Sequence, residues 1–95
     1  MKDVVGFEWD AGNSGKNWKS HAVTDEECEE AFFDPDKKVA VDETHSQNER
    51  RYFLLGNTSQ SRLLVIVFTI RHERIRVISA RDINKKERKL YEKEY

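Results

Sequence analysis

Residues 62–70 read Arg62-Leu63-Leu64-Val65-Ile66-Val67-Phe68-Thr69-Ile70, a stretch that contains the longest apolar run of the sequence. Nearly every position is apolar and many are β-branched, so both faces of this segment are expected to be buried. Strands buried on both faces lie inside a sheet. The stretch therefore predicts a central strand, and the neighbouring segments can be arranged around it.

Further strands are predicted on either side of this segment. The four residues 71–74 turn the chain, and Ile75–Ala80 returns as the second strand of a hairpin. Upstream, residues 56–59 form a turn that follows a strand at Arg51–Leu55. Two shorter strands are expected at residues 4–9 and 39–42.

The clearest helix is predicted at Thr24–Phe33. Thr24 is a good N-cap, and Glu27 three residues later completes a capping box. Pro35 follows the helix, and the residue before a proline avoids the helical region. An apolar stripe at helical spacing marks the buried side: Cys28, Ala31 and Phe32. Cys28 is therefore interpreted as a small hydrophobic residue.

Two other helices complete the prediction. Residues 16–21 form a short helix, and a terminal helix covers residues 85–95, with Asn84 as N-cap and Glu87 as its capping-box partner. The sum is an α+β fold in a single domain of residues 1–95. We expect a mainly antiparallel sheet of about four strands, with helices near the N-terminus and one closing helix.

Charge is distributed unevenly along the 95 residues. The chain carries 17 basic and 18 acidic residues, for a formal net charge of −1. Residues 1–49 hold 5 basic and 13 acidic residues, whereas residues 50–95 hold 12 basic and 5 acidic residues. Such asymmetry predicts a surface that faces a polyanion or a charged partner, unless the two halves pair within the fold.

Length and composition exclude several classes of protein. A chain this short excludes a two-domain enzyme, and its longest apolar run is far below the roughly 18 residues of a membrane helix. The single cysteine excludes an internal disulfide and fits the cytoplasm. One cysteine and three scattered histidines give no zinc-binding spacing, so we expect no metal and no cofactor.

The basic half is rich in arginine on or beside the predicted sheet. Arginine grips phosphate with a planar fork, which favours an RNA-binding surface. The alternative is that outward strand positions happen to be arginine and protect the sheet edges. From composition alone, both interpretations have equal weight. The arginines are Arg50, Arg51, Arg62, Arg71, Arg74, Arg76 and Arg81.

Side chains alternate between the two faces of a strand, so the arginines within residues 74–81 are divided between the faces. Arg74 and Arg76 share one face, while Val77 and Arg81 share the other. This parity predicts that Arg81 is a partly buried, oriented charge beside Val77.

Two residues are candidate proton-transfer groups. His21 follows Lys19 at the end of the short helix and could act as a general acid or base. A surface or capping histidine is the simpler interpretation from the residues alone. Glu87 is most simply a capping-box residue that can also pair with an arginine, and a catalytic carboxylate is the alternative.

Taken in order, these segments resemble the BrnT toxin family. The resemblance rests on the following segments: Phe7-Glu8-Trp9-Asp10, Lys16-Asn17-Trp18-Lys19-Ser20-His21, Val23-Thr24, Glu29-Glu30-Ala31-Phe32-Phe33-Asp34-Pro35, Arg51, Gly56, Arg62 to Thr69, Arg74 to Arg81, Glu87-Arg88 and Tyr91. Each piece is weakly specific, but the ordered set spans nearly the whole chain.

The resemblance implies a small ribonuclease toxin with a RelE-like fold. It also implies a BrnA-type antitoxin with a ribbon-helix-helix part, so that the toxin would contact DNA only through the complex. Within the family pattern, Arg71 and Arg81 fall on the arginines tied to toxicity, with Thr69 beside the first. Lys19 and His21 match the family's Lys-His-Gly segment loosely.

The chain departs from that segment at two positions. Ser20 stands where the family has lysine, and Ala22 stands where it has glycine. Alanine does not adopt a positive φ cheaply, so we expect the local turn to differ. A non-catalytic module with a degenerate site, which binds nucleic acid or only the antitoxin, therefore stays open as the alternative.

The expected chemistry is metal-independent cleavage of RNA. The 2′-hydroxyl attacks the adjacent phosphate and leaves a cyclic phosphate and a 5′-hydroxyl. Arg71 and Arg81 would stabilise the charged phosphorane, each by about 3–4 kcal/mol by analogy with oxyanion holes. His21 is the first choice of proton acceptor and Glu87 the second. RNA contacts are assigned to Lys19, Thr69, Arg74 and Arg76.

Overall fold

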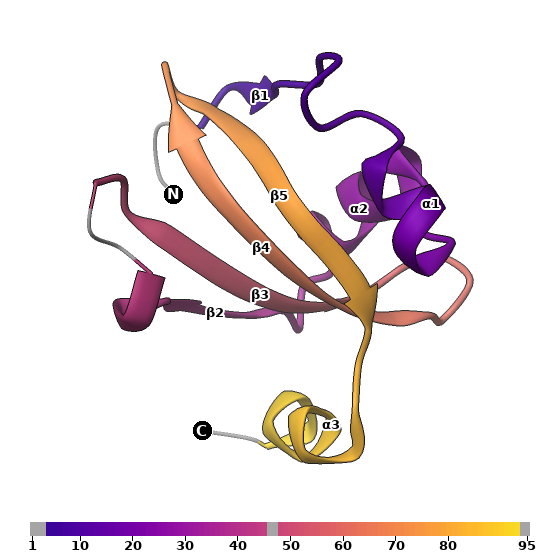
Figure 1. Cartoon of the computed structure of the whole chain (residues 1–95). Helices are drawn as coiled ribbons and strands as arrows, with labels where there is room; N and C mark the ends of the chain where they lie inside the picture. The colour runs from indigo at the N-terminus through magenta and orange to yellow at the C-terminus, as the bar shows by residue number, and fades with distance from the viewer. Residues whose placement is uncertain (1–3, 46–47, 94–95) are drawn as a thin grey trace.

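A computed structural model describes residues 4–45 and 48–93 and has an α+β fold (Figure 1). The chain order is β1 (Gly6–Phe7), α1 (Lys16–His21), α2 (Asp25–Phe32), β2 (Lys38–Val41), a 3-10 turn (Glu43–His45), β3 (Arg51–Asn57), β4 (Leu63–Arg71), β5 (Arg74–Asp82) and α3 (Lys85–Glu92).

The strands form a single sheet in the order β1-β5-β4-β3-β2. The prediction of about four strands is wrong, because the N-terminal segment adds a fifth strand that pairs parallel to β5. That contact joins Gly6 to Arg74 and Phe7 to Ile75, so only two residues take part. The other neighbours pair antiparallel, and the sheet is therefore mixed.

Strand β4 is central, as its apolar sequence predicts. It lies between β3 and β5, and residues from Leu63 to Phe68 are buried except for the half-buried Val67. The turn after β4 is tight: His72 and Glu73 have φ values of 50° and 64°. Two residues with positive φ match the twist of a two-residue hairpin.

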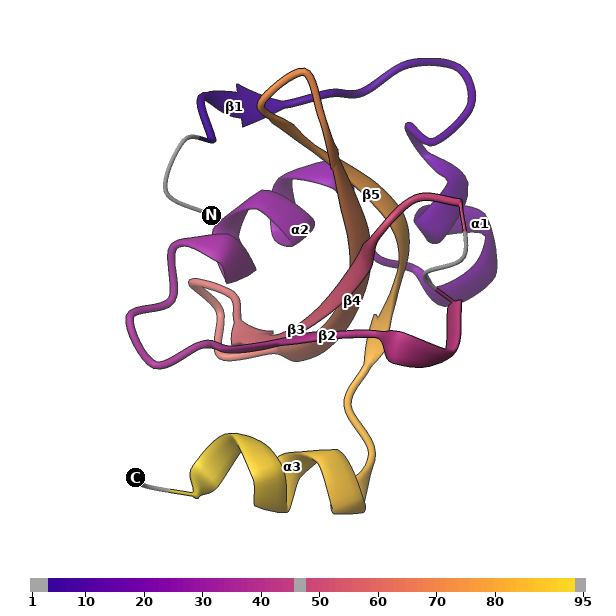
Figure 2. The same cartoon turned by 90° about the vertical axis from the view of Figure 1, so that its left-hand side faces the viewer.

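Helices cover the two faces of the sheet unequally. Figure 2 shows α2 on one side of the strands and α3 on the other. The main core lies under α2, where Cys28 and Ala31 are fully buried against Leu54 and Ile66. Burial raises the pKa of the Cys28 thiol to about 12, which fits its predicted role as a small hydrophobic residue. Aromatic rings extend this core through Phe7, Phe32, Phe68 and Tyr52.

Both predicted capping boxes are present. In α2 the Thr24 hydroxyl accepts from Glu27 N at 3.0 Å, and in α3 the Asn84 side chain accepts from Glu87 N at 2.8 Å. Helix α3 has no fully buried residue. Polar contacts hold it instead, among them the Tyr91 hydroxyl, which donates to Asp34 Oδ2 at 2.6 Å.

A bulge in β5 changes which face its later residues occupy. Val67 lies opposite Ser79 and Phe68 lies opposite Val77, so Ile78 has no partner in the register. The extra residue reverses the alternation from that point on. Arg81 consequently shares a face with Ser79 and Arg76, and the prediction that it lies beside Val77 is wrong.

Two asparagines occupy the open edge of β5 beyond its contact with β1. Asn13 Nδ2 donates to Val77 O at 3.2 Å, and Asn17 Oδ1 accepts from Ala80 N at 3.0 Å. Both side chains are nearly fully buried. They satisfy backbone groups that would otherwise invite pairing with another strand, and they attach α1 and its preceding loop to the sheet.

The chain leaves α1 through a left-handed residue. Ala22 has φ 55° and ψ 39°, and its N–H donates to Trp18 O at 3.0 Å. The expectation that alanine would prevent this conformation is therefore wrong. Alanine is held in a region that glycine reaches at lower cost, because a Cβ crowds the following carbonyl.

Replacing Asn17 by alanine should destabilise the fold. The change leaves the Ala80 N–H buried without an acceptor, which we expect to cost about 1–3 kcal/mol in the free energy of unfolding. Urea denaturation followed by circular dichroism measures the loss. Ser20→Ala, an exposed change on the same helix, is the control and should stay within about 0.5 kcal/mol of wild type. Equal stability of the two variants would contradict the role of Asn17.

Replacing Ala22 by glycine should stabilise the fold. Relief of the left-handed alanine is worth about 1–2 kcal/mol, and the greater freedom of glycine in the unfolded chain offsets about 0.4–1 kcal/mol of it. We expect a net gain of up to about 1 kcal/mol, seen as a higher denaturation midpoint at an unchanged slope. Ala40→Gly, in a strand with ordinary backbone geometry, should instead lose stability.

Candidate active site

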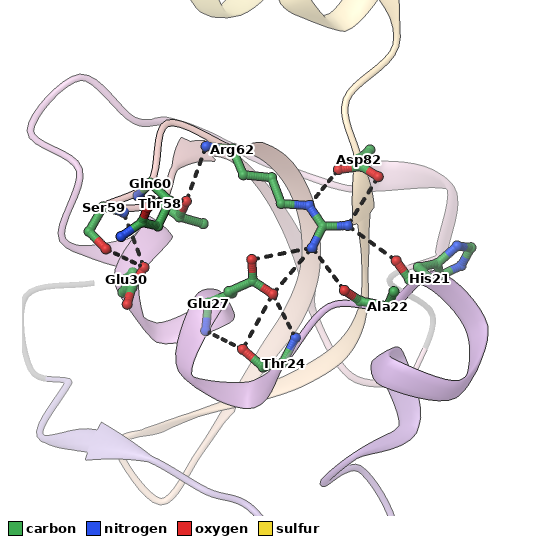
Figure 3. Close-up of polar contacts among 10 residues, drawn as sticks. All are labelled: His21, Ala22, Thr24, Glu27, Glu30, Thr58, Ser59, Gln60, Arg62 and Asp82. Atoms are coloured by element: carbon green, nitrogen blue, oxygen red, sulfur yellow. Dashed lines mark hydrogen bonds and ion pairs between the residues drawn. The ribbon is translucent and has the colours of Figure 1, made fainter.

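Arg62 lies at the centre of the polar contacts where α1, α2 and the end of β5 meet (Figure 3). Its Nε donates to Asp82 Oδ1 at 2.7 Å and its Nη2 to Asp82 Oδ2 at 3.1 Å. Its Nη1 donates to both carboxylate oxygens of Glu27 at 3.2 Å. Two backbone carbonyls accept as well, Ala22 O at 2.8 Å and His21 O at 3.2 Å. We call these five residues the Arg62 clamp.

The clamp fixes the charge state of its members. The hydrogen bond to Asp82 raises the pKa of Arg62 above its usual range. The same bond lowers the pKa of Asp82. Burial works against ionisation of Glu27, but hydrogen bonds from Thr24 and Arg62 outweigh it and lower the pKa of Glu27. Because each nitrogen of Arg62 already donates to an acceptor, this arginine is a structural cation and has no donor left for RNA.

The Arg62 clamp contacts His21 at its backbone carbonyl and not at its imidazole. Figure 3 shows its carbonyl facing Arg62 and its imidazole pointing away from the clamp. The imidazole is exposed at the end of α1 and lies near Asp82, whose pKa it helps to lower. A fixed backbone and a free ring suit a group that exchanges protons with a bound molecule.

Arg81 and Glu87 form a bidentate pair on the face covered by α3. Arg81 Nη1 donates to Glu87 Oε1 at 2.9 Å and Nη2 donates to Glu87 Oε2 at 2.7 Å. The bond from Arg81 lowers the pKa of Glu87 and keeps it ionised at neutral pH. The predicted pairing of Glu87 with an arginine is confirmed. As a carboxylate with a lowered pKa, Glu87 is a weak proton acceptor.

A second charged group lies at the β4–β5 turn. Arg71 donates to both oxygens of Glu49, with Nε–Oε2 at 2.6 Å, and Arg76 contacts Glu8 at 3.0 Å and Asp10 at 2.8 Å. These bonds lower the pKa values of Glu49 and Asp10 and raise those of both arginines. Acidic residues of the first half thus neutralise arginines of the second, which confirms the expectation of partial pairing.

The remaining predicted RNA contacts differ in accessibility. Thr69 is 1% exposed and donates to Arg50 O at 2.9 Å, so its hydroxyl is used inside the protein. Arg74 is exposed at the turn, and Lys19 is exposed on α1. Thr69 can therefore act only by supporting the backbone beside the turn.

The structure does not bring all the predicted residues together. Arg71 pairs with Arg74 at one end of the hairpin, and Arg81 lies seven residues further along β5. At roughly 3.3 Å per residue this is about 23 Å, so Arg71 and Arg81 cannot hold one phosphate. At the other end, Arg81 and Asp82 are adjacent in sequence, and Asp82 binds the arginine that holds His21.

Sequence reasoning missed the acidic and amide partners at these sites. Three carboxylates bind an arginine that lies at least 20 residues away in the sequence: Glu27, Asp82 and Glu49. The four-residue spacing of Asn13, ahead of the short helix, and Asn17, in its first turn, was an available signal, because amides buried on one side need backbone partners.

Comparison with known protein families gives a match over most of the chain. Residues 9–87 match the family model described as the ribonuclease toxin BrnT of type II toxin–antitoxin systems. The chain belongs to this family. No curated protein matches it. Membership of the BrnT family implies the role of a ribonuclease toxin. A type II toxin–antitoxin system also implies an antitoxin partner.

Two other findings bear on function in the described part of the chain. No helix there has the length and apolar character to span a membrane. The same residues contain no group of three or more histidine, cysteine, aspartate or glutamate side chains arranged to hold a metal ion. The matched segment of the BrnT family includes every candidate residue, with Glu87 at its end.

Arg62→Met should remove the clamp while keeping the length of the side chain. We expect a loss of about 2 kcal/mol at pH 7, because carboxylates and carbonyls lose their donor in a site that is only partly exposed. The folded pKa values of Glu27 and Asp82 are lowered, so their stabilisation is present above 4.5 and 3.8, the usual pKa values of these groups, and is lost as the pH falls through the folded values.

Wild type and Arg62→Met should accordingly converge in stability as the pH is lowered from 5 to about 2. Denaturation curves at a series of pH values measure the difference. Arg88→Met, at an exposed position on α3, should track wild type throughout. A constant gap between wild type and Arg62→Met down to the lowest pH would show that the ion pairs are not the cause.

Proposed function

We propose that this protein is a metal-independent endoribonuclease that acts in the cytoplasm as the toxin of a type II toxin–antitoxin system. The match of residues 9–87 to the BrnT family carries the proposal. On this proposal the fold is RelE-like, RNA cleavage inhibits growth, and a BrnA-type antitoxin with a ribbon-helix-helix part neutralises the toxin. DNA is contacted only through that complex.

The proposed reaction takes place near the end of β5, where Arg81 is followed directly by Asp82, the carboxylate that lies near His21. His21 accepts the proton of the 2′-hydroxyl as that oxygen attacks the adjacent phosphorus. The bond from phosphorus to the 5′-oxygen breaks and leaves a 2′,3′-cyclic phosphate, while the 5′-oxygen takes up a proton from solvent to become a hydroxyl and His21 returns its proton to solvent. Arg81 stabilises the negative charge of the phosphorane, because a guanidinium fork matches two phosphate oxygens.

Glu87 has a supporting part in this mechanism. Its two bonds hold the Arg81 guanidinium in one orientation before substrate arrives, which limits the reorganisation needed during reaction. Glu87 remains the second choice of base, but its lowered pKa favours His21. Arg71, Arg74 and Arg76, with Lys19 on α1, are assigned to the RNA backbone outside the reacting phosphate.

A non-catalytic module is the second candidate function. The observation that favours it is the internal pairing of the candidate cations, since Arg71, Arg76 and Arg81 each bind a carboxylate of the same chain. Ser20 in place of the family's lysine removes a further cation beside His21. A protein that binds nucleic acid or only its antitoxin would need no free cation at a reacting phosphate.

The proposal is tested by incubating the purified protein with RNA in EDTA and mapping the product ends. We expect cleavage that persists in EDTA and yields cyclic phosphates and 5′-hydroxyls. Arg81→Ala should lower the rate by roughly 100- to 1,000-fold, as expected for loss of one preorganised donor to a charged intermediate. Arg88→Ala, an exposed arginine on α3, should cleave like wild type. Loss of activity in EDTA, or 5′-phosphate ends, would refute the mechanism.

The two candidate functions are separated by expression in cells. Induction of the active toxin should arrest growth, and co-expression of the neighbouring reading frame should relieve the arrest. Folded Arg81→Ala should not arrest growth if the protein is a nuclease. Arrest that survives this substitution would favour the non-catalytic module.

A further inference from the structure

Helix α1 is rigidly attached to the rest of the protein although it has only six residues. The Asn17 side chain binds the β5 backbone at Ala80, and Arg62 binds the carbonyls at the end of the helix. The preceding loop is held as well, since Ser14 Oγ and Gly15 N donate to the Asp25 carboxylate at 2.6 Å and 3.2 Å. The backbone that carries the outward side chains of α1 is therefore held in place.

The largest of these outward side chains is Trp18. It is 59% exposed, while Asn17 beside it is 3% exposed and forms the inner anchor. Trp18 and His21 are three residues apart on the helix, so their Cβ atoms lie roughly 5–6 Å apart on one side. An indole is thus placed next to the imidazole to which the reaction is assigned.

The charges around Trp18 favour a polyanion. Helix α1 contains Lys16, Lys19 and His21 and no acidic residue. Lys16 and Lys19 also line a hollow of about 280 Å³, together with residues of the glycine-containing loop 11–15. Asp25 and Asp82, which lie close to the two ends of α1, each accept hydrogen bonds from donors of the protein itself.

A second exposed aromatic residue has the opposite surroundings. Phe33 at the end of α2 is 77% exposed, but it lies in sequence among Glu30, Asp34 and Asp36, and an apolar groove adjoins it. Carboxylates repel phosphate, and three of them outnumber the lysines at positions 37 and 38 beside Phe33, so Phe33 is less suited to RNA than Trp18, whose helix contains no acidic residue. Both residues are aromatic and more than half exposed, and they differ in the charge around them.

We propose that Trp18 is a stacking platform for an unpaired RNA base and that Lys16 and Lys19 contact the adjoining phosphates. Exposed aromatic rings among cations bind single-stranded nucleic acid in this way, because every base offers a π-face and the backbone supplies the charge. The inference rests on the proposed function, to which it adds the substrate class: a single-stranded segment presented beside His21.

The two tryptophans of the chain allow a direct test of stacking. Trp9 is half-buried: its Nε1 donates to Glu29 Oε2 at 2.6 Å and its side chain packs against the core, so it reports from a more enclosed position than Trp18. A short single-stranded 2′-O-methyl oligoribonucleotide is the probe, because it lacks the attacking hydroxyl and is not cleaved. We expect it to quench the fluorescence of Trp9→Phe, whose remaining indole is Trp18. It should not quench that of Trp18→Phe.

Affinity measurements give the second readout. Trp18→Ala should weaken binding of the same probe about 5- to 150-fold, the range reported by removing one stacked aromatic ring. Trp18→Phe should retain most of the affinity, and Phe33→Ala is the matched exposed control and should bind like wild type. Lys16→Gln and Lys19→Gln should each lower the slope of log affinity against log salt by roughly 0.7. Circular dichroism and melting temperature confirm that each variant is folded.

The outcomes distinguish this inference from the proposed function. No quenching of Trp9→Phe, equal binding by wild type and Trp18→Ala, or equal quenching by single-stranded and duplex RNA would each overturn the stacking platform. Cleavage of unmodified RNA is assayed separately. If the probe quenches Trp18 but RNA is not cut, the nuclease proposal fails and the single-strand platform stands.

Discussion

The contacts of Arg62 are the interaction on which the functional end of the molecule depends. One guanidinium joins the start of β4 to the end of β5, the first turn of α2 and the last carbonyls of α1. These carbonyls would otherwise lack donors at a helix end, and Glu27 and Asp82 would be unpaired carboxylates close together. Arg62 provides donors for these carbonyls and for both carboxylates. The Arg62 clamp therefore fixes the end of α1 and the position of His21.

The unequal charge of the two halves has a structural meaning that the net charge of −1 conceals. Arg62, Arg71 and Arg76 from the basic half bind Glu27, Glu49 and Asp10 from the acidic half. The pairs join the ends of the sheet to its flanking segments. These arginines of the basic half therefore stabilise the fold. Fewer of its cations are left to bind RNA than the sequence suggests. Lysines of α1 matter more than their small number implies, because no acid of α1 opposes them.

Local signals in the sequence predicted local structure well. The capping boxes at Thr24 and Asn84 marked both helix starts, and the apolar run in β4 marked the central strand. The wrong predictions concern contacts between segments that lie far apart in the sequence. Nothing in the alternation of β5 signals the bulge at Ile78, so the face of Arg81 did not follow from pattern. A strand was predicted at residues 4–9, but β1 pairs through two residues only, and its place as a fifth strand of the sheet was missed. The resemblance gave Arg71 and Arg81 together as candidates, and it could not show that they lie at opposite ends of the β4–β5 hairpin.

The bulge also determines how a substrate can reach the proposed site. Asp82 lies opposite Leu64 of the core, whereas Arg81 lies opposite Val65 on the face of α3. His21 is on the side of Asp82, so Arg81 and His21 approach a common phosphate only around the edge of β5. In the described residues no strand pairs with that edge beyond Ile75, but the Asn13 and Asn17 side chains bond to its backbone and α1 packs against it, so a nucleic acid has to pass over them. Duplex RNA is too broad and stiff to turn around a strand edge, whereas a single strand is flexible. The geometry of β5 and the exposed indole on α1 thus favour the same substrate, an unpaired segment of RNA.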